Sequence, residues 1–105
     1  MSQLIAIIEA QGIFEKEYGE QIRQQVLDLA KQDYQKILID FSQVSFMNST
    51  GLGILVSIYT TLKKMQKELF LCSINEQIKI IFELTGMDSC FVIYDDQATF
   101  QQSLE

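Results

Sequence analysis

The chain has 105 residues, which suits one domain spanning residues 1–105 with its own core and is too short for two. Hydrophobic residues make up 48% and charged residues 21%, a mix that excludes disordered, collagen-like and coiled-coil classes. The formal net charge of −6 repels phosphate backbones and anionic membrane surfaces, so a protein partner is favoured over nucleic acid.

The first third of the chain predicts a strand followed by an amphipathic helix. Leu4 to Ile8 is an apolar run typical of a strand, and Gly12 is expected to break it where the chain turns. An extra strand near this turn is compatible with the pattern. From about Tyr18 to Gln32, apolar residues recur at helical spacing, which predicts a helix with one buried stripe. The stripe consists of Ile22, Val26, Leu29 and Ala30.

A central strand and a second helix follow. The run from Ile37 to Ile39 shows no alternation, which is typical of a strand covered on both faces in a mostly parallel sheet. From Thr50 to about Lys67, apolar residues form a broad helical face, and the absence of proline allows a long helix. The face comprises Leu52, Leu55, Val56, Tyr59 and Leu62.

The last third repeats the alternation of strand and helix. Glu68 to Cys72 is predicted to be a strand, and a helix is expected from about Asn75 to Thr85, with Gly86 as its stop. A strand over Phe91–Tyr94 precedes a short helix that is capped by Asp95 or Asp96 and ends near Leu104. This order predicts an α/β sandwich with right-handed crossovers.

A serine turn joins the central strand to the second helix. Its sequence is Phe46-Met47-Asn48-Ser49-Thr50-Gly51-Leu52-Gly53, and sites in open α/β sheets lie in such loops beyond the carboxyl ends of strands. A hydroxyl at a helix N-terminus faces unpaired N–H groups and the positive end of the helix dipole, which stabilise an added phosphate. Ser49 is therefore a candidate phosphorylation switch. Simple helix capping by Ser49 is the alternative.

The turn resembles the signature of STAS domains, specifically that of the anti-sigma factor antagonists, in which the serine before a Gly-Leu-Gly-type turn is phosphorylated. The resemblance covers most of the chain, from the Gly12 region to Leu84-Thr85-Gly86-Met87. It implies a STAS-like α/β sandwich with a mostly parallel mixed sheet of four to five strands and about four helices.

The resemblance also implies roles for single residues. Ser49 matches the phosphorylated serine, and Thr50 matches a second hydroxyl. Asp40 matches the acidic residue that ends the central strand, beside the serine. Glu15 falls where many members carry Asp and is a possible acidic site residue. The implied switch-loop and partner-binding residues are Asp40, Met47, Asn48, Thr50, Gly51, Leu52, Gly53, Ile54 and Ile58.

Several of these residues fit a structural interpretation as well. Met47, Ile54 and Ile58 suit either an exposed apolar docking patch around the switch or ordinary core positions. Gly51 and Gly53, taken alone, fit relief of backbone sterics or helix packing better than nucleotide binding, since no Walker pattern follows them.

The function that the resemblance implies is partner switching. The unmodified chain would bind a serine kinase that is itself an anti-sigma factor, phosphorylation on Ser49 would release it, and a serine phosphatase would reset the cycle. We expect a cytoplasmic bacterial regulator of transcription, monomeric or weakly dimeric, without cofactor or metal. Asn48 stands where phosphorylated members usually carry Asp, so the alternative is an unphosphorylated STAS scaffold in a signalling assembly or transporter system.

Other functional classes lack the residues that they need. The chain contains no histidine, which rules out a Ser-His-Asp arrangement within it, and no Gly-x-Ser-x-Gly, so an enzyme is not expected. Cys72 and Cys90 form no CxxC pair and are expected to be small buried thiols. Asp95 and Asp96 lack calcium-loop spacing and fit helix capping. No apolar run approaches the roughly 20 residues of a membrane span.

Overall fold

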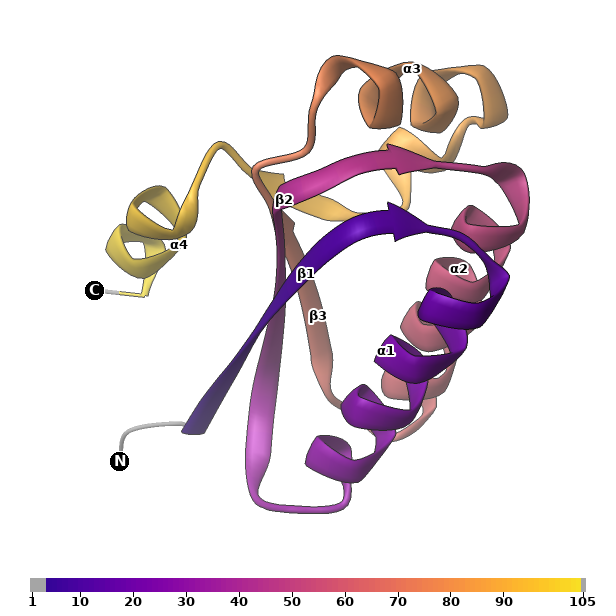
Figure 1. Ribbon diagram of the computed structural model, residues 1–105. Helices are drawn as coiled ribbons and strands as arrows, with labels where there is room; N and C mark the ends of the chain where they lie inside the picture. Colours follow the sequence, from indigo (N-terminus) through magenta and orange to yellow (C-terminus); the bar gives the residue numbers. More distant parts are fainter. Residues whose placement is uncertain (1–3, 105) are drawn as a thin grey trace.

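The computed structural model describes residues 4–104 and shows an α/β sandwich (Figure 1). Four strands form one sheet in the order β1-β2-β3-β4, and every neighbouring pair is parallel. The predicted class is confirmed, but no antiparallel or extra strand occurs within residues 4–104. The elements are β1 (Leu4–Phe14), α1 (Lys16–Ala30), β2 (Tyr34–Met47), α2 (Ser49–Lys64), β3 (Glu68–Cys72), α3 (Glu76–Thr85), a 3₁₀ turn (Met87–Ser89), β4 (Val92–Tyr94) and α4 (Gln97–Ser103).

The two faces of the sheet are covered unequally. Helices α1, α2 and α3 contribute to the main core on one face, where Val26, Leu55 and Phe82 are fully buried. Helix α4 lies on the opposite side of the sheet from α1 and α2 (Figure 1). On that side, Phe100 of α4 and Leu38 of β2 belong to a second, smaller buried cluster, which other strand residues complete. The fold therefore has one large core and a minor layer of one short helix.

Strand β1 does not end where it was expected to end. Gly12 adopts a φ of +78°, a conformation that glycine tolerates without strain, and the pairing with β2 shifts register on both sides of it. The strand continues as far as Phe14, so the prediction that Gly12 breaks it is wrong. Gly12 instead marks an irregularity that bends a long strand.

Strand β2 is also longer than the predicted segment. Only Lys36 to Asp40 pair with β3, whereas Gln43 to Met47 pair with the distal part of β1. Phe41, Val44 and Met47 are the buried residues of this extension, and their spacing of three lacks the alternation of a regular strand. Asp40 therefore lies inside β2, and the prediction that it ends the strand is wrong.

The helix limits follow from caps and turns. Gly86 ends α3 with a φ of +74°, as predicted, and Asn75, where this helix was expected to begin, is its cap. Of the two predicted candidates Asp95 and Asp96, Asp96 caps α4. Helix α2 ends at Lys64 and not near Lys67. The Lys67 ammonium instead donates to the carbonyl oxygens of Gln32 and Tyr34, at 3.0 and 2.6 Å, and so ties the turn before β3 to the start of β2.

Candidate functional site

The serine turn has its own helix cap, which is Asn48. The Asn48 Oδ1 accepts a hydrogen bond of 2.8 Å from the Gly51 N–H, and the Asn48 carbonyl oxygen accepts one of 3.0 Å from the Leu52 N–H. Ser49 is the first residue of α2. The interpretation of Ser49 as the capping residue is therefore wrong.

Ser49 and Thr50 are both exposed in the first turn of α2. Within residues 4–104, neither hydroxyl has a hydrogen-bond partner, and neither do the two backbone N–H groups. Such first-turn donors, at the positive end of a 16-residue helix, favour an anion beside them. The geometry can therefore accept a phosphate on Ser49 without breaking any contact described.

Gly51 fixes the position of this turn against β1. A Cβ atom at Gly51 would collide with the carbonyl oxygen of Phe14, and the Asn48 N–H donates to the same oxygen at 3.4 Å. Gly53 differs, because a Cβ atom there would meet only open space. The packing interpretation therefore holds for Gly51 and not for Gly53, and both glycines lie within α2 rather than in a loop.

The predicted apolar docking patch does not form. Met47 and Ile58 are fully buried and Ile54 is only 9% exposed, so the core interpretation of these residues is confirmed. Leu52 is also buried. The physical reason is that α2 packs against both the sheet and α1, where Ile54 lies over Gly19.

The apolar residues that are exposed at this end of the sheet belong to other elements. Ile13 and Phe46 pair across β1 and β2, and Ile80 and Leu84 lie on α3. None of these four residues belongs to the docking patch that the sequence predicts. In α3, the buried residues Ile78 and Phe82 are spaced by four and mark the inward face, and Ile80 and Leu84 fall outside it.

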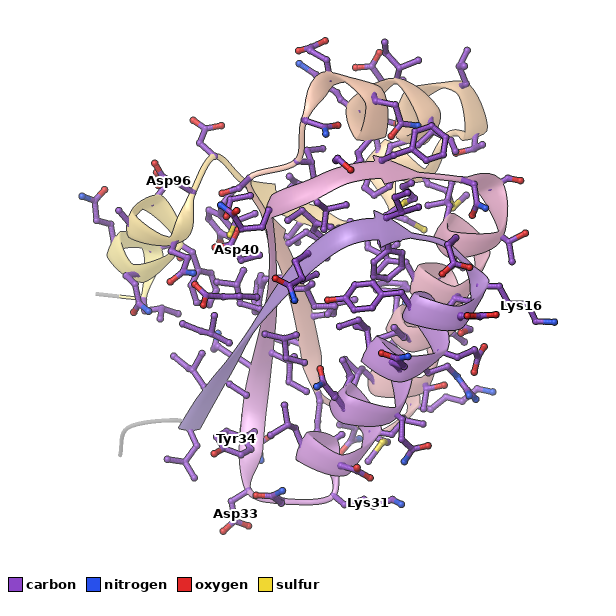
Figure 2. All side chains as sticks on the ribbon, viewed as in Figure 1. Lys16, Lys31, Asp33, Tyr34, Asp40 and Asp96 are labelled. Atoms are coloured by element: carbon purple, nitrogen blue, oxygen red, sulfur yellow. The ribbon has the colours of Figure 1, made fainter. Side chains whose placement is uncertain are left out.

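Asp40 lies away from the serine turn. Met47 follows it by seven positions along β2, which is roughly 23 Å of extended chain. Figure 2 places Asp40 near the start of α4, across the molecule from Lys16 at the start of α1. The expectation that Asp40 lies beside Ser49 is therefore wrong.

The Asp40 carboxylate is buried and fully hydrogen-bonded. It accepts from the Ser42 N–H at 2.8 Å and from the Gln97 Nε2 at 2.6 Å, and the same Gln97 nitrogen also donates to Glu9 at 3.1 Å. Burial acts to raise the pKa of Asp40, but the hydrogen bonds from Gln97 and Ser42 outweigh it and hold the pKa below its usual value. Asp40 thereby joins α4 to the sheet.

Glu15 caps α1. Its carboxylate accepts from the N–H groups of Glu17 and Tyr18 at 2.9 and 3.1 Å, and these two bonds lower the pKa of Glu15. Because Glu15 follows Phe14, whose carbonyl oxygen contacts the serine turn, the start of α1 lies beside the start of α2. The acidic group is thus near the turn, with a capping contact already made.

The two cysteines have different surroundings. Cys72 is fully buried beside Asp40, and burial raises the pKa of its thiol to about 11. Cys90 is only half-buried, so the prediction of two buried thiols holds for Cys72 alone. In the described part of the chain, no cluster of three or more metal-ligating side chains occurs, and no helix is long and apolar enough to cross a membrane.

Comparison with known proteins assigns the family. The model of the STAS domain matches residues 3–100. The chain belongs to the STAS domain family. The anti-sigma-B factor antagonist of Listeria monocytogenes is 38% identical over 55 residues, which are 52% of this chain and 48% of that protein. The anti-sigma-B factor antagonist of Staphylococcus aureus is 35% identical over 65 residues, 61% of this chain and 60% of that protein. The chain thus spans about half to three fifths of the curated relatives it matches.

Solved STAS structures share the fold. A putative anti-sigma factor antagonist from Thermotoga maritima superposes with a TM-score of 0.85 at 24% identity, covering 95% of this chain and 86% of that one. The unphosphorylated form of the anti-sigma factor antagonist SpoIIAA superposes with a TM-score of 0.77 at 18% identity, covering 97% and 90%. At these identities, the likeness supports the STAS architecture.

Proposed function

We propose that this STAS domain is an anti-sigma factor antagonist that changes partners through phosphorylation of Ser49. The observation that carries the proposal is the exposed Ser49 hydroxyl at the first position of α2, with Asn48 acting as the cap. The curated relatives named as anti-sigma-B factor antagonists support it. The chain acts as a binding protein and not as an enzyme, in the cytoplasm of a bacterium, as a monomer or weak dimer.

The proposed cycle alternates between two states of the surface around Ser49, unmodified and phosphorylated. The unmodified chain binds a serine kinase that is itself an anti-sigma factor. The kinase transfers the γ-phosphoryl group of ATP to the Ser49 Oγ, whose proton is released, and a serine phosphatase later removes the phosphate by hydrolysis. The N–H groups of Ser49 and Thr50 at the start of α2 are available to the added oxygens, so the domain keeps its fold in both states.

Phosphorylation weakens binding because it places charge in an interface. The group adds about 1.5 to 2 negative charges at neutral pH. Burying such a charge without a partner costs several kcal/mol, and about 4 kcal/mol corresponds to roughly a thousandfold loss of affinity. Because Ser49 is exposed, this penalty arises only when a partner covers the turn.

The test of the modification itself is mass spectrometry. The chain is purified from its native host, and its intact mass and fragments are measured before and after phosphatase treatment. We expect one removable phosphate that maps to Ser49 and not to Thr50. The absence of phosphate at Ser49 under all growth conditions tested would contradict the proposal.

A second candidate function is favoured by Asn48. Its amide caps α2 without the negative charge of the Asp that phosphorylated members usually carry, and the domain would then serve as an unphosphorylated scaffold in a signalling assembly or transporter system. Asn48→Asp distinguishes the two. Phosphorylation of Asn48→Asp by a kinase that leaves the wild type unmodified would favour the scaffold, whereas phosphorylation of both chains at equal rates would favour the switch.

A further inference from the structure

Four large apolar side chains are exposed at the end of the sheet where α2 begins. Ile13 is 55% exposed, Phe46 45%, Ile80 50% and Leu84 81%. Ile13 and Phe46 are cross-strand partners in β1 and β2. These four residues are called the apolar patch below. Large apolar side chains that are exposed together at one end of a fold mark sites of interaction.

The direction of α3 brings Ile80 and Leu84 toward the serine turn. Asn75, before α3, donates to carbonyl groups of β2 upstream of Met47, and Gln77 bonds both the N–H and the carbonyl oxygen of Met47 at 2.8 Å. Helix α3 therefore runs along β2 in the same direction, and its later turns extend past the end of β2 (Figure 1). Ile80 and Leu84 follow Gln77 by three and seven residues and share its side of the helix.

Phe46 connects the patch to Ser49, which follows it by three residues. A partner that covers Phe46 and Leu84 would therefore approach the first turn of α2. Ser49 itself contributes little apolar area to such a contact, and the predicted contributors Met47, Ile54 and Ile58 are buried. The apolar patch is thus the available source of affinity next to the switch.

The charges around the patch indicate which partner fits. Glu76 and Glu83 are exposed on α3 and neighbour Ile80 at helical spacing. Lys79 of the same helix lines a pocket with both glutamates and with Asp88 and Asp95, so the charge beside the patch is negative on balance. With a net charge of −6, a second copy of the chain would bring like charges together at this surface. A protein with an apolar centre edged by Lys or Arg would complement it.

We propose that the apolar patch is the docking surface for the anti-sigma factor, which covers it with an apolar face edged by basic residues. This proposal rests on the proposed function. The patch supplies the affinity, and Ser49, at its margin, supplies the control.

The test compares two neutral substitutions of exposed apolar residues. Ile80→Gln combined with Leu84→Gln removes the α3 half of the patch, and Met65→Gln is the matched control at the far end of α2, where Met65 is 38% exposed. Each serine kinase anti-sigma factor encoded by the source organism is purified and titrated calorimetrically with the full chain. We expect the double variant to bind at least tenfold more weakly and Met65→Gln to bind within twofold of the wild type.

The outcomes separate this docking site from the switch. Unchanged affinity in the double variant, with weakened binding by Ser49→Asp, would overturn the docking site and leave the switch standing. Weakened binding by the double variant, with equal binding by Ser49→Ala and Ser49→Asp, would support the docking site and overturn the switch. Failure of the wild type to bind any of these kinases would overturn both. Self-association that the double variant abolishes, without any change in kinase affinity, would assign the patch to a second copy and overturn the docking site.

Discussion

The placement of the serine turn depends on Gly51, and an alanine there has a calculable consequence. The new Cβ atom would collide with the Phe14 carbonyl oxygen and lie 2.9 Å from the Phe14 carbonyl carbon and 3.1 Å from the Phe14 ring. Overpacking costs about 1–3 kcal/mol, and we take the upper end because the obstructing atoms are backbone. Alanine gains about 1 kcal/mol over glycine in a helix. The net destabilisation is about 2 kcal/mol, or roughly a thirtyfold fall in the ratio of folded to unfolded chain.

Gly53 provides the matched control two residues away. A Cβ atom at Gly53 meets nothing within 4 Å, so Gly53→Ala keeps the helix-propensity gain and stabilises the chain by up to about 1 kcal/mol. Urea unfolding followed by circular dichroism measures both variants, with equal slopes required for comparison. Wild-type stability in Gly51→Ala, or a loss in Gly53→Ala, would refute the close packing of α2 on β1.

Three further predictions concern caps, pH and thiol reactivity. Asn48→Ala should lose about 1 kcal/mol of stability because the cap is missing, whereas Ser49→Ala should stay within about 0.5 kcal/mol of the wild type. Thermal melts measure both variants. A larger loss in Ser49→Ala than in Asn48→Ala would show that Ser49 is the cap. The folded pKa of Asp40 is lowered, so its contribution is present above its unfolded pKa of about 4 and is lost as pH falls through the folded value. When the free energy of unfolding is measured against pH, Asp40→Asn should therefore lose less stability at acid pH than the wild type does. Equal losses in the two chains would contradict this. The Cys72 thiol, with a pKa of about 11, should resist alkylation at pH 8 until urea unfolds the chain, and labelling of the folded chain at Cys72 would show that it is accessible.

Local signals predicted local structure well. Asn75 and Gly86 delimit α3 as their residue types indicate, because caps depend on a few neighbouring atoms. The strand Glu68–Cys72 was predicted with its observed bounds for a similar reason, since a short buried run between polar residues has few other interpretations.

Features that depend on distant partners were missed. The extension of β2 to Met47 exists because β1 continues beside it, and no pattern within β2 reports that pairing. For the same reason, Asp40 was predicted to lie at a strand end beside Ser49. It lies inside β2 instead, where it accepts a hydrogen bond from Gln97 of α4. Periodicity alone did not decide the burial of Ile54 and Ile58, because α2 is apolar over a wide arc and two elements cover it.

The serine turn illustrates both cases. Its place at the start of α2 followed from residue types, whereas the division of roles between Asn48 and Ser49 required the geometry of the cap. Two adjacent polar residues at a helix start are equally suited to capping by composition, and only the extended backbone of Asn48 assigns it the role.

The central claim is that one phosphate on Ser49 controls partner binding, and a calorimetric titration tests it most directly. The anti-sigma factor kinase is titrated into unmodified chain, into chain phosphorylated on Ser49, and into phosphorylated chain after phosphatase treatment. Thr60→Asp, which adds charge at an exposed site farther along α2, serves as the control for charge alone. The account predicts a loss of affinity approaching a thousandfold on phosphorylation, full recovery after phosphatase and near-normal binding by Thr60→Asp. Equal affinity for the phosphorylated and unmodified chains would contradict it.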